Sequence, residues 1–96
     1  MADRVVLMSG VVIYTRQFCG YCSAAKTLLE RKGVDFAEKD ATGKPEIRQE
    51  MMARSGRTTF PQIFVGDTHV GGCDDLYDLD AAGRLDPLLA AAGAKG

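Results

Sequence analysis

The sequence has no excess of one charge, no long apolar run and no even set of cysteines. Twelve basic and thirteen acidic residues leave a formal charge of -1, which gives no electrostatic reason to expect a nucleic acid or an acidic membrane as partner. The longest apolar stretch, VVLMSGVVIY, is interrupted by Ser9 and Gly10 and is too short to span a bilayer. No basic segment precedes an apolar one at the N-terminus, so we expect no signal peptide.

The cysteine count indicates the compartment. Three cysteines in 96 residues do not form the paired framework of a small secreted protein, so we expect the reducing cytoplasm. A C-x-x-C pair in that compartment is more often metal-binding or redox-active than structural. The composition, 46% hydrophobic and 26% charged, is that of one globular domain that can bury a core without disulfides or metal.

Apolar periodicity and turn residues predict alternating strands and helices. We expect strands over Val11–Thr15, Val34–Lys39, Gln62–Val65 and Thr68–Val70, and helices over Tyr21–Lys32, from Pro45 to Gly56, from Asp74 to Ala82 and from Leu85 to Ala92. Strand–helix–strand units favour parallel pairing, and the Gly66-Asp67 hairpin adds an antiparallel pair. The sequence therefore predicts an α/β fold with a four-stranded mixed sheet flanked by helices.

Two of these helices have a clear apolar face, which we expect to pack on the sheet. The inward residues are Ala24, Ala25, Leu28 and Leu29 in the first helix, and Ile47, Met51 and Met52 in the second.

The stretch TRQFCGYCSAAK places Cys19 and Cys22 at the start of the first helix, directly after a strand. Backbone N–H groups and the helix dipole favour a thiolate at Cys19, while Cys22 lies one turn further in and is more enclosed. Arg16 and Lys26 could add positive potential. Because the thiolate is the species that attacks a disulfide, this arrangement is typical of an attacking thiol backed by a resolving thiol.

Ligand counting leaves a zinc site open. Cys19, Cys22, His69 and Cys73 would supply a Cys₃His set. However, a zinc-binding pair normally occupies a tight turn of its own, and His69 falls in a short hairpin strand, where we expect an ordinary edge residue. We therefore favour redox chemistry.

Three separated motifs resemble the glutaredoxin family over Val11 to Leu89. CGYC is similar to the family's dithiol active site, TFP to its Thr-Val-Pro signature, and GGCDDL to its glycine-pair glutathione-binding turn. Thioredoxin is a poorer match, because its motif carries a Trp that this chain lacks. The resemblance implies the thioredoxin fold, with an N-terminal extension at residues 1–10 and a glutaredoxin domain at residues 11–92.

The resemblance also implies a glutathione site. By position its residues are Arg16, Tyr21, Arg48, Thr59, Phe60, Pro61, Gly72, Cys73 and Asp74. Pro61 would be cis, leaving the Phe60 backbone to pair with the cysteine portion of glutathione. N–H groups at Cys73 and Asp74 would hold the γ-glutamyl carboxylate, the Asp74 side chain its ammonium group, and the two arginines the glycyl carboxylate.

The function implied is that of a glutathione-dependent thiol–disulfide oxidoreductase. Cys19 would attack protein disulfides and glutathione mixed disulfides, with Cys22 resolving the former. The alternative is a carrier of a [2Fe-2S] cluster, because Gly20 replaces the family's usual Pro, and some members without that Pro bind a cluster between two subunits through the first active-site Cys and glutathione. In that case Cys19 is the metal ligand; otherwise we expect no metal. We expect a monomer, and a semi-buried thiol at Cys73 that the chemistry does not require.

Overall fold

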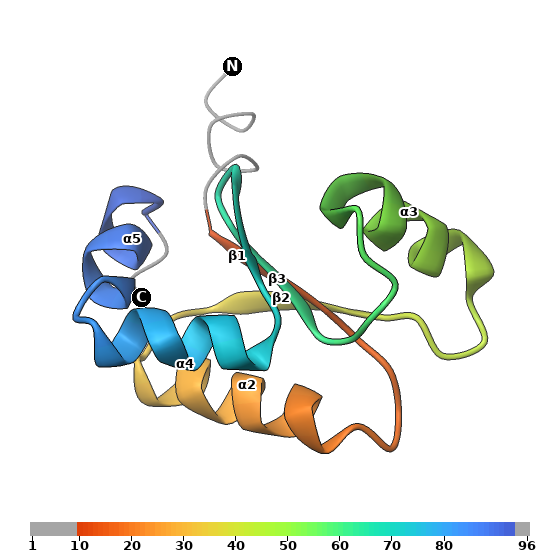
Figure 1. Ribbon diagram of the computed structural model, residues 1–96, viewed down its shortest axis with the longest axis horizontal. Coiled ribbons are helices and arrows are strands. Elements are labelled where there is room, and N and C mark those ends of the chain that lie inside the picture. Colours follow the sequence, from red (N-terminus) through yellow and green to blue (C-terminus); the bar gives the residue numbers. More distant parts are fainter. Residues whose placement is uncertain (1–9, 94–96) are drawn as a thin grey trace.

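The computed structural model describes residues 10–93, so the expected extension lies, except for Gly10, outside the described residues. Strands and helices alternate along the chain as the sequence predicts (Figure 1). The elements are β1 (Val11–Thr15), α2 (Gly20–Arg31), β2 (Phe36–Asp40), α3 (Pro45–Ser55), β3 (Gln62–Val65), β4 (Thr68–Gly71), α4 (Cys73–Ala81) and α5 (Leu85–Ala91). No helix in this range is long and apolar enough to cross a membrane.

The sheet is four-stranded and mixed, in the order β2-β1-β3-β4. β1 pairs in parallel with β2, and antiparallel pairs join β1 to β3 and β3 to β4. The predicted α/β architecture is therefore confirmed. The register of the last pair shifts between Ile63 and Phe64, so that Phe64 lies opposite His69 while Ile63 lies opposite Gly71.

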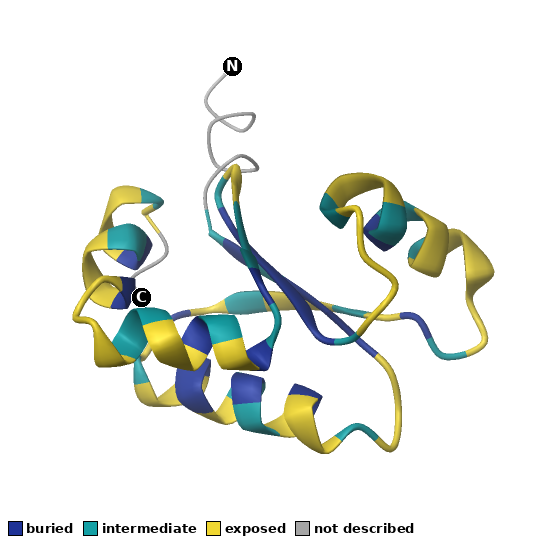
Figure 2. Ribbon diagram, in the orientation of Figure 1, coloured by how far each residue is buried: buried dark blue, intermediate teal, exposed yellow. Residues whose placement is uncertain are grey.

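One face of the sheet is covered by α2 and α4, which lie side by side, with α5 beyond them (Figure 1). Their inward residues form a large apolar core, dark blue in Figure 2, whose members include Leu28, Leu29, Leu76 and Leu89. Aliphatic burial of this kind supplies most of the driving force for folding. α2 thus buries the face that its periodicity predicts, with Ala24 only partly buried.

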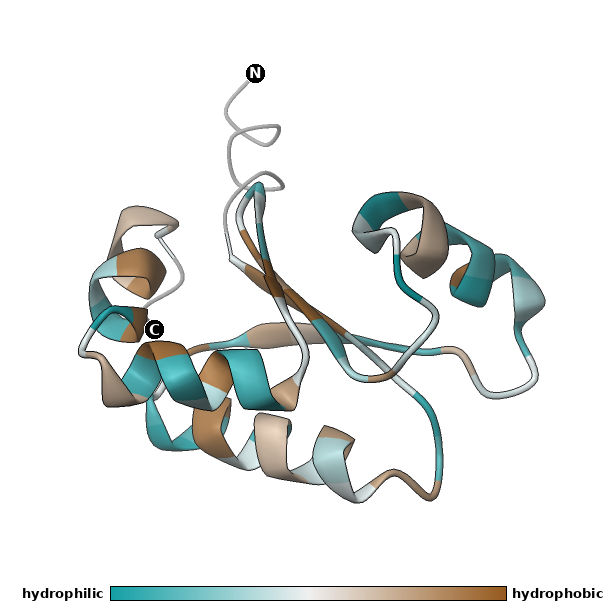
Figure 3. Cartoon of the chain, viewed as in Figure 1, coloured by the Kyte–Doolittle hydropathy of each residue, from teal (hydrophilic) through white to brown (hydrophobic). Residues whose placement is uncertain are grey.

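Within residues 10–93, the helix on the opposite face is α3 (Figure 1). There Tyr14, Met51 and Phe64 form a small cluster, with Ile47 and Met52 partly buried against it. The predicted inward residues of this helix are confirmed. Figure 3 shows that most of the helix is hydrophilic, in contrast to the brown central strands, so much of its surface faces water.

Element boundaries differ from the predictions by one or two residues. The second strand begins at Phe36 instead of Val34, because Gly33 turns the chain and Val34 packs into the core before pairing with β1 starts opposite Val11. The third helix begins at Cys73, one residue earlier than predicted.

Candidate active site

Cys19 is the N-cap of α2. Its backbone is extended (φ -124°, ψ 104°), and its Sγ accepts a hydrogen bond from the Cys22 N–H at 3.2 Å. The same sulfur lies 4.0 Å from the Phe60 carbonyl oxygen. Cys19 is partly exposed, so its sulfur is accessible while the first turn of the helix supplies N–H groups that stabilise a negative charge on it.

Cys22 differs sharply from Cys19 in its surroundings. Its exposed fraction is 2%. The pKa of its thiol is raised to about 12, mainly by burial and secondly by the hydrogen bond with Cys19. Cys22 is therefore a neutral thiol at physiological pH. Both thiols are free, and only one of them is placed to attack an incoming disulfide.

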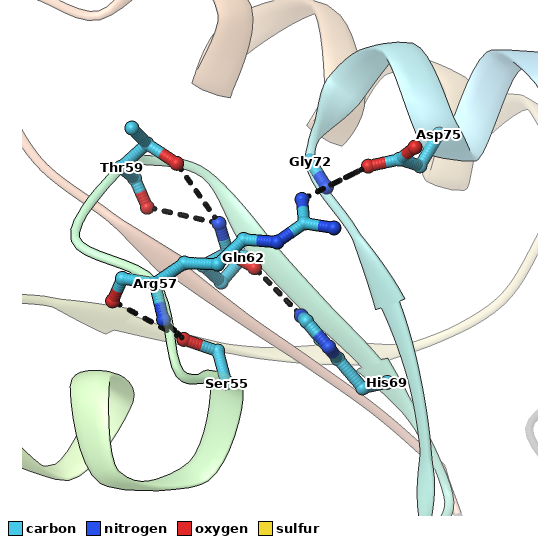
Figure 4. Close-up of polar contacts among 7 residues, drawn as sticks. All are labelled: Ser55, Arg57, Thr59, Gln62, His69, Gly72 and Asp75. Carbon is cyan, nitrogen blue, oxygen red and sulfur yellow. Dashed lines mark hydrogen bonds and ion pairs between the residues drawn. The ribbon is translucent and has the colours of Figure 1, made fainter.

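The segment before β3 approaches Cys19 from the other side. The Phe60–Pro61 peptide bond is cis, as the resemblance implies. Thr59 is tied to the sheet, since Gln62 Nε2 donates to its carbonyl oxygen and to its Oγ1, each at 3.1 Å (Figure 4).

The start of α4 completes the site. Gly72 is its N-cap, and the Asp75 carboxylate accepts from the Gly72 N–H at 2.9 Å. Gly71 has φ +115°, and a Cβ there would collide with the Asp75 carboxylate, so this turn requires glycine. Arg57 reaches the same carboxylate at 3.2 Å (Figure 4).

An open groove of about 270 Å³ lies between these segments. Its lining residues are Tyr21, Arg57, Thr59, Phe60, Pro61, Gly72, Cys73, Asp74 and Asp75. A larger hollow of about 600 Å³ beside β2 and Arg54 has no cysteine in its lining. The smaller groove is adjacent to Cys19 through its lining residue Phe60, whose carbonyl oxygen lies 4.0 Å from Cys19 Sγ.

Seven of the residues expected from the resemblance meet in this groove, whereas Arg16 and Arg48 do not line it. Both arginines are exposed, and the Arg16 guanidinium donates to the neighbouring Gln17 carbonyl at 3.4 Å. Arg57 and Asp75 are lining residues that sequence reasoning missed. Their signals were present: Arg57 lies two residues before the TFP motif, and Asp75 is a helix N3 carboxylate of the kind that caps helix starts.

Two other expectations about charge and metal change with the structure. Lys26 Nζ forms an ion pair with Glu38 at 3.0 Å, so part of its charge is directed to that carboxylate. His69 is not an ordinary edge residue, because its Nε2 lies 2.7 Å from Gln62 Oε1. No group of three or more metal-ligating side chains occurs within residues 10–93, and the Cys₃His set is not assembled there.

Cys73 lies in the groove but is itself buried, with an exposed fraction of 7%. Burial is the main reason that the pKa of its thiol is raised, and the charge of Asp74 adds to it. The thiol, expected to be semi-buried, is thus buried, and it is neutral at physiological pH.

Comparison with known proteins agrees with this geometry. The glutaredoxin family model matches residues 11–70. A glutaredoxin of Pseudomonas aeruginosa is 60% identical over 84 residues, covering 88% of this chain and all of the relative. Glutaredoxin 3 of Escherichia coli is 58% identical, covering 85% of this chain and 99% of the relative.

Among solved structures, a buckwheat glutaredoxin–glutathione complex superposes with a TM-score of 0.84 at 28% identity, covering 99% of this chain and 89% of that one. The fold is the thioredoxin fold of these neighbours. The chain belongs to the glutaredoxin family of glutathione-dependent thiol–disulfide oxidoreductases.

Proposed function

We propose that Cys19 is the nucleophile and Cys22 the resolving thiol of a dithiol glutaredoxin. The observation that carries this assignment is the asymmetry of the pair: Cys19 is accessible at a helix N-terminus, whereas Cys22 is buried and its pKa is raised to about 12. The thiolate of Cys19 attacks the glutathione sulfur of a mixed disulfide, and the other sulfur leaves as a reduced thiol. A second glutathione thiolate then attacks the glutathione on Cys19, giving oxidised glutathione and restoring the Cys19 thiolate.

For a protein disulfide, Cys22 completes the reaction. Burial is the largest cause of the raised pKa of Cys22, and the hydrogen bond with Cys19 and the negative charge of Cys19 add to it. Once Cys19 is joined to the substrate, that charge is gone and the pKa of Cys22 falls. Cys22 then attacks Cys19 Sγ, the bond between Cys19 Sγ and the substrate sulfur breaks, and the departing substrate thiolate takes up the proton that Cys22 gives up. The substrate leaves with both of its sulfurs reduced, and the Cys19–Cys22 disulfide holds the two-electron oxidation until glutathione reduces it.

We assign glutathione to the groove of about 270 Å³. Phe60 would pair through its backbone with the cysteine portion, Thr59, Pro61 and Tyr21 would line the cleft, and N–H groups at the start of α4 would hold the γ-glutamyl carboxylate. The site includes Gly72, Cys73 and Asp74, and the Asp74 carboxylate would take the ammonium group. Support comes from the lining of the groove and from the similar buckwheat protein, which binds glutathione.

The glycyl carboxylate needs a cation. Arg16 and Arg48 are the candidates by position, and Arg57 joins them because it lines the groove. Its guanidinium already has one carboxylate partner in Asp75, so it would bridge protein and ligand.

The test is NADPH consumption with glutathione, glutathione reductase and hydroxyethyl disulfide. Cys19→Ser should abolish turnover, because neither Cys22 nor Cys73 is accessible. Cys22→Ser should keep deglutathionylation but lose reduction of protein disulfides. Turnover that survives Cys19→Ser would contradict the assignment of the nucleophile, and loss of both activities in Cys22→Ser would contradict the division of labour.

A second candidate function is transport of a [2Fe-2S] cluster by a glutathione-ligated dimer. Gly20 occupies the first position of α2, where an added Cβ would meet no other atom within 4 Å, and Cys19 beside it is accessible for a bond to iron. One chain supplies only this cysteine, so a second subunit and glutathione would complete the ligand set. Reconstitution with iron, sulfide and glutathione should give a brown protein whose colour is lost in Gly20→Pro; a colourless wild-type product excludes this function.

We further propose a monomer in the cytoplasm as the state that reduces disulfides, with disulfide-bonded or glutathionylated proteins as substrates. The three free thiols suit a reducing compartment. We propose that residues 11–92 form the glutaredoxin domain and that residues 1–10 are an N-terminal extension of it. Light scattering of the metal-free protein should give the mass of one chain; a dimer in that state would contradict the proposal.

A further inference from the structure

We propose that Gln62 is a positioning residue for the glutathione groove, and that His69 holds Gln62 in place. Together they fix Thr59, and through it the Phe60 backbone, against Cys19. This inference rests on the proposed glutathione site, because Thr59 and Phe60 line that groove. Neither Gln62 nor His69 lines it, so their role would be exerted through Thr59.

Gln62 is an unusual residue for its place in the fold. It begins the central strand β3, its exposed fraction is 0%, and the rest of the strand is Ile63, Phe64 and Val65. Burial of an amide is costly unless its hydrogen bonds are made. Packing alone would be served by an apolar residue of the same length, so the amide group needs another explanation.

The two ends of the Gln62 amide have different partners. Its Nε2 lies 3.1 Å from the Thr59 carbonyl oxygen and 3.1 Å from Thr59 Oγ1, and its Oε1 lies 2.7 Å from His69 Nε2 (Figure 4). A carbonyl oxygen can only accept. The amide nitrogen must therefore face Thr59, and both of its hydrogens have an acceptor there.

This orientation determines the tautomer of His69. Since Gln62 Oε1 can only accept, His69 must donate from Nε2. The neutral ring therefore carries its proton on Nε2, and desolvation together with the nearby charge of Arg57 lowers the pKa of His69 and favours that neutral form. The hydrogen-bonded chain runs in one direction, from His69 through Gln62 to Thr59.

The far end of this chain is anchored in the sheet. The His69 ring stacks on Phe64 with centroids 4.8 Å apart and planes 27° apart, and the two residues are register partners across β3 and β4. Every buried side-chain polar atom within residues 10–93 has a hydrogen-bond partner. Loss of either amide contact would therefore leave an unsatisfied buried group, which favours rearrangement of the segment.

The near end of the chain acts on the groove. Because the Thr59 carbonyl is bound on the sheet side, the following peptide is left to face the active site, and the Phe60 carbonyl oxygen lies 4.0 Å from Cys19 Sγ. A glutathione paired with the Phe60 backbone needs this geometry to bring its sulfur to Cys19. Gln62 thus positions the ligand without contacting it.

The first test compares Gln62→Met with Ile63→Val. Methionine keeps the length of the side chain and removes the amide, so the two hydrogen bonds to Thr59 and the one from His69 are all lost. We expect the KM for glutathione to rise about tenfold, in keeping with the loss of hydrogen bonds of ordinary strength, while kcat and the rate of Cys19 alkylation change less than about twofold. Ile63→Val is the matched control, because it removes one methyl group from the opposite face of the same strand and should leave the KM unchanged.

The second test uses the single histidine of the chain, whose ring ¹⁵N signals are unambiguous. The wild-type protein should show the Nε2–H tautomer in the neutral state, and Gln62→Met should show a mixture of tautomers. His69→Phe keeps a stacked ring but removes the donor, so its KM should rise about threefold, a fraction of the loss at Gln62. It supplies the kinetic readout if Gln62→Met does not fold.

The outcomes separate the two proposals. No turnover by the wild-type enzyme would overturn the proposed function, and this inference with it. Wild-type turnover with an unchanged glutathione KM in Gln62→Met, or in His69→Phe where only that variant folds, would overturn the inference alone. An Nδ1–H tautomer in the wild-type protein would overturn it as well.

Discussion

On one face of the sheet, α2, α4 and α5 enclose twelve buried residues, whereas on the other face α3 covers three, counted over residues 10–93. The larger core is aliphatic apart from Cys73. The smaller one contains two aromatic rings and a methionine. The area removed from water, and with it the hydrophobic contribution to stability, is therefore concentrated on the α2 and α4 side.

Polar contacts compensate on the α3 side. Glu50 accepts hydrogen bonds from the Tyr14 hydroxyl and from Lys39, the latter at 2.6 Å. Arg54 donates to the Tyr14 hydroxyl at 2.9 Å, and its guanidinium lies 4.1 Å from the centroid of the Phe64 ring. α3 is thus attached to the sheet through charged and hydroxyl groups as much as through apolar contact.

The groove is lined by Tyr21 of α2, by the segment before β3 and by the start of α4. Cys22 lies in α2 and Cys73 in α4, on the apolar face of the sheet, which is the face covered by α2, α4 and α5. Burial of the two thiols there keeps both of them neutral. Thr59 is held by Gln62, which pairs with Tyr14 in the sheet register. Burial on the α2 and α4 side thus keeps Cys22 and Cys73 neutral, and hydrogen bonds from Gln62 of β3 hold Thr59 in the lining of the groove.

The largest loss of stability should come from a substitution in the core on the apolar face of the sheet. Leu29→Ala removes a side chain with 0% exposure from the main core and should lower the free energy of unfolding by about 2–5 kcal/mol. Urea denaturation at neutral pH measures it. Since Leu29 does not line the groove, the folded variant should retain its KM for glutathione. A loss below about 1 kcal/mol would show that this core does not dominate stability.

An intermediate effect should come from Tyr14. Tyr14→Phe keeps the ring, which meets Phe64 edge-on at 5.9 Å, but removes the hydroxyl that joins Glu50 and Arg54. The free energy of unfolding should fall by about 1–3 kcal/mol, because both partners lose a contact. Tyr77→Phe is the matched control. Its hydroxyl donates to the Ala24 carbonyl at 3.0 Å from an exposed position, so its loss should cost about 0.5 kcal/mol or less. Equal losses in the two variants would refute a special role for the Tyr14 contacts.

Sequence reasoning was most successful where local pattern determines structure. The apolar period of α2 identified Ala25, Leu28 and Leu29 as inward residues, and they are buried. The strand–helix order was sufficient for the mixed sheet, because a short hairpin and a helical crossover leave few ways to pair four strands. The resemblance to the glutaredoxins then predicted that Thr59 and Asp74, which are far apart in sequence, belong to one site, and both line the same groove.

What escaped prediction depends on register and on long side chains. His69 reaches Gln62 across β3 and β4, where the register shifts by one residue between Ile63 and Phe64, and no local signal marks such a shift. The contacts of Glu50 and Arg54 with the Tyr14 hydroxyl likewise have no counterpart among the predictions made from the sequence. Contacts made by flexible polar side chains follow from tertiary placement, which periodicity does not encode.

The smallest effect should be on the pH dependence of stability, and it should come from the polar contacts on the α3 side of the sheet. Hydrogen bonds from Lys39, and then from Tyr14, lower the pKa of Glu50. A carboxyl whose pKa is lower in the folded state contributes stability above its unfolded pKa of about 4.3, and this contribution is lost as pH falls through the folded value. Glu50→Gln removes that term, so its stability should fall less steeply than that of the wild-type protein below about pH 4.5.

The size of this difference is limited by water. The Glu50 side chain is 38% exposed, so solvent screening should keep the difference below about 1 kcal/mol, and added salt should shrink it. Urea denaturation from pH 3 to 6 at low and high ionic strength measures it, with Glu46→Gln, an exposed carboxylate in the first turn of the same helix, as control. Parallel pH profiles for wild type and Glu50→Gln would mean that Glu50 stabilises α3 through hydrogen-bond geometry alone. If the stability of Glu50→Gln alone falls less steeply at acid pH, the charge of Glu50 is part of what attaches α3 to the sheet.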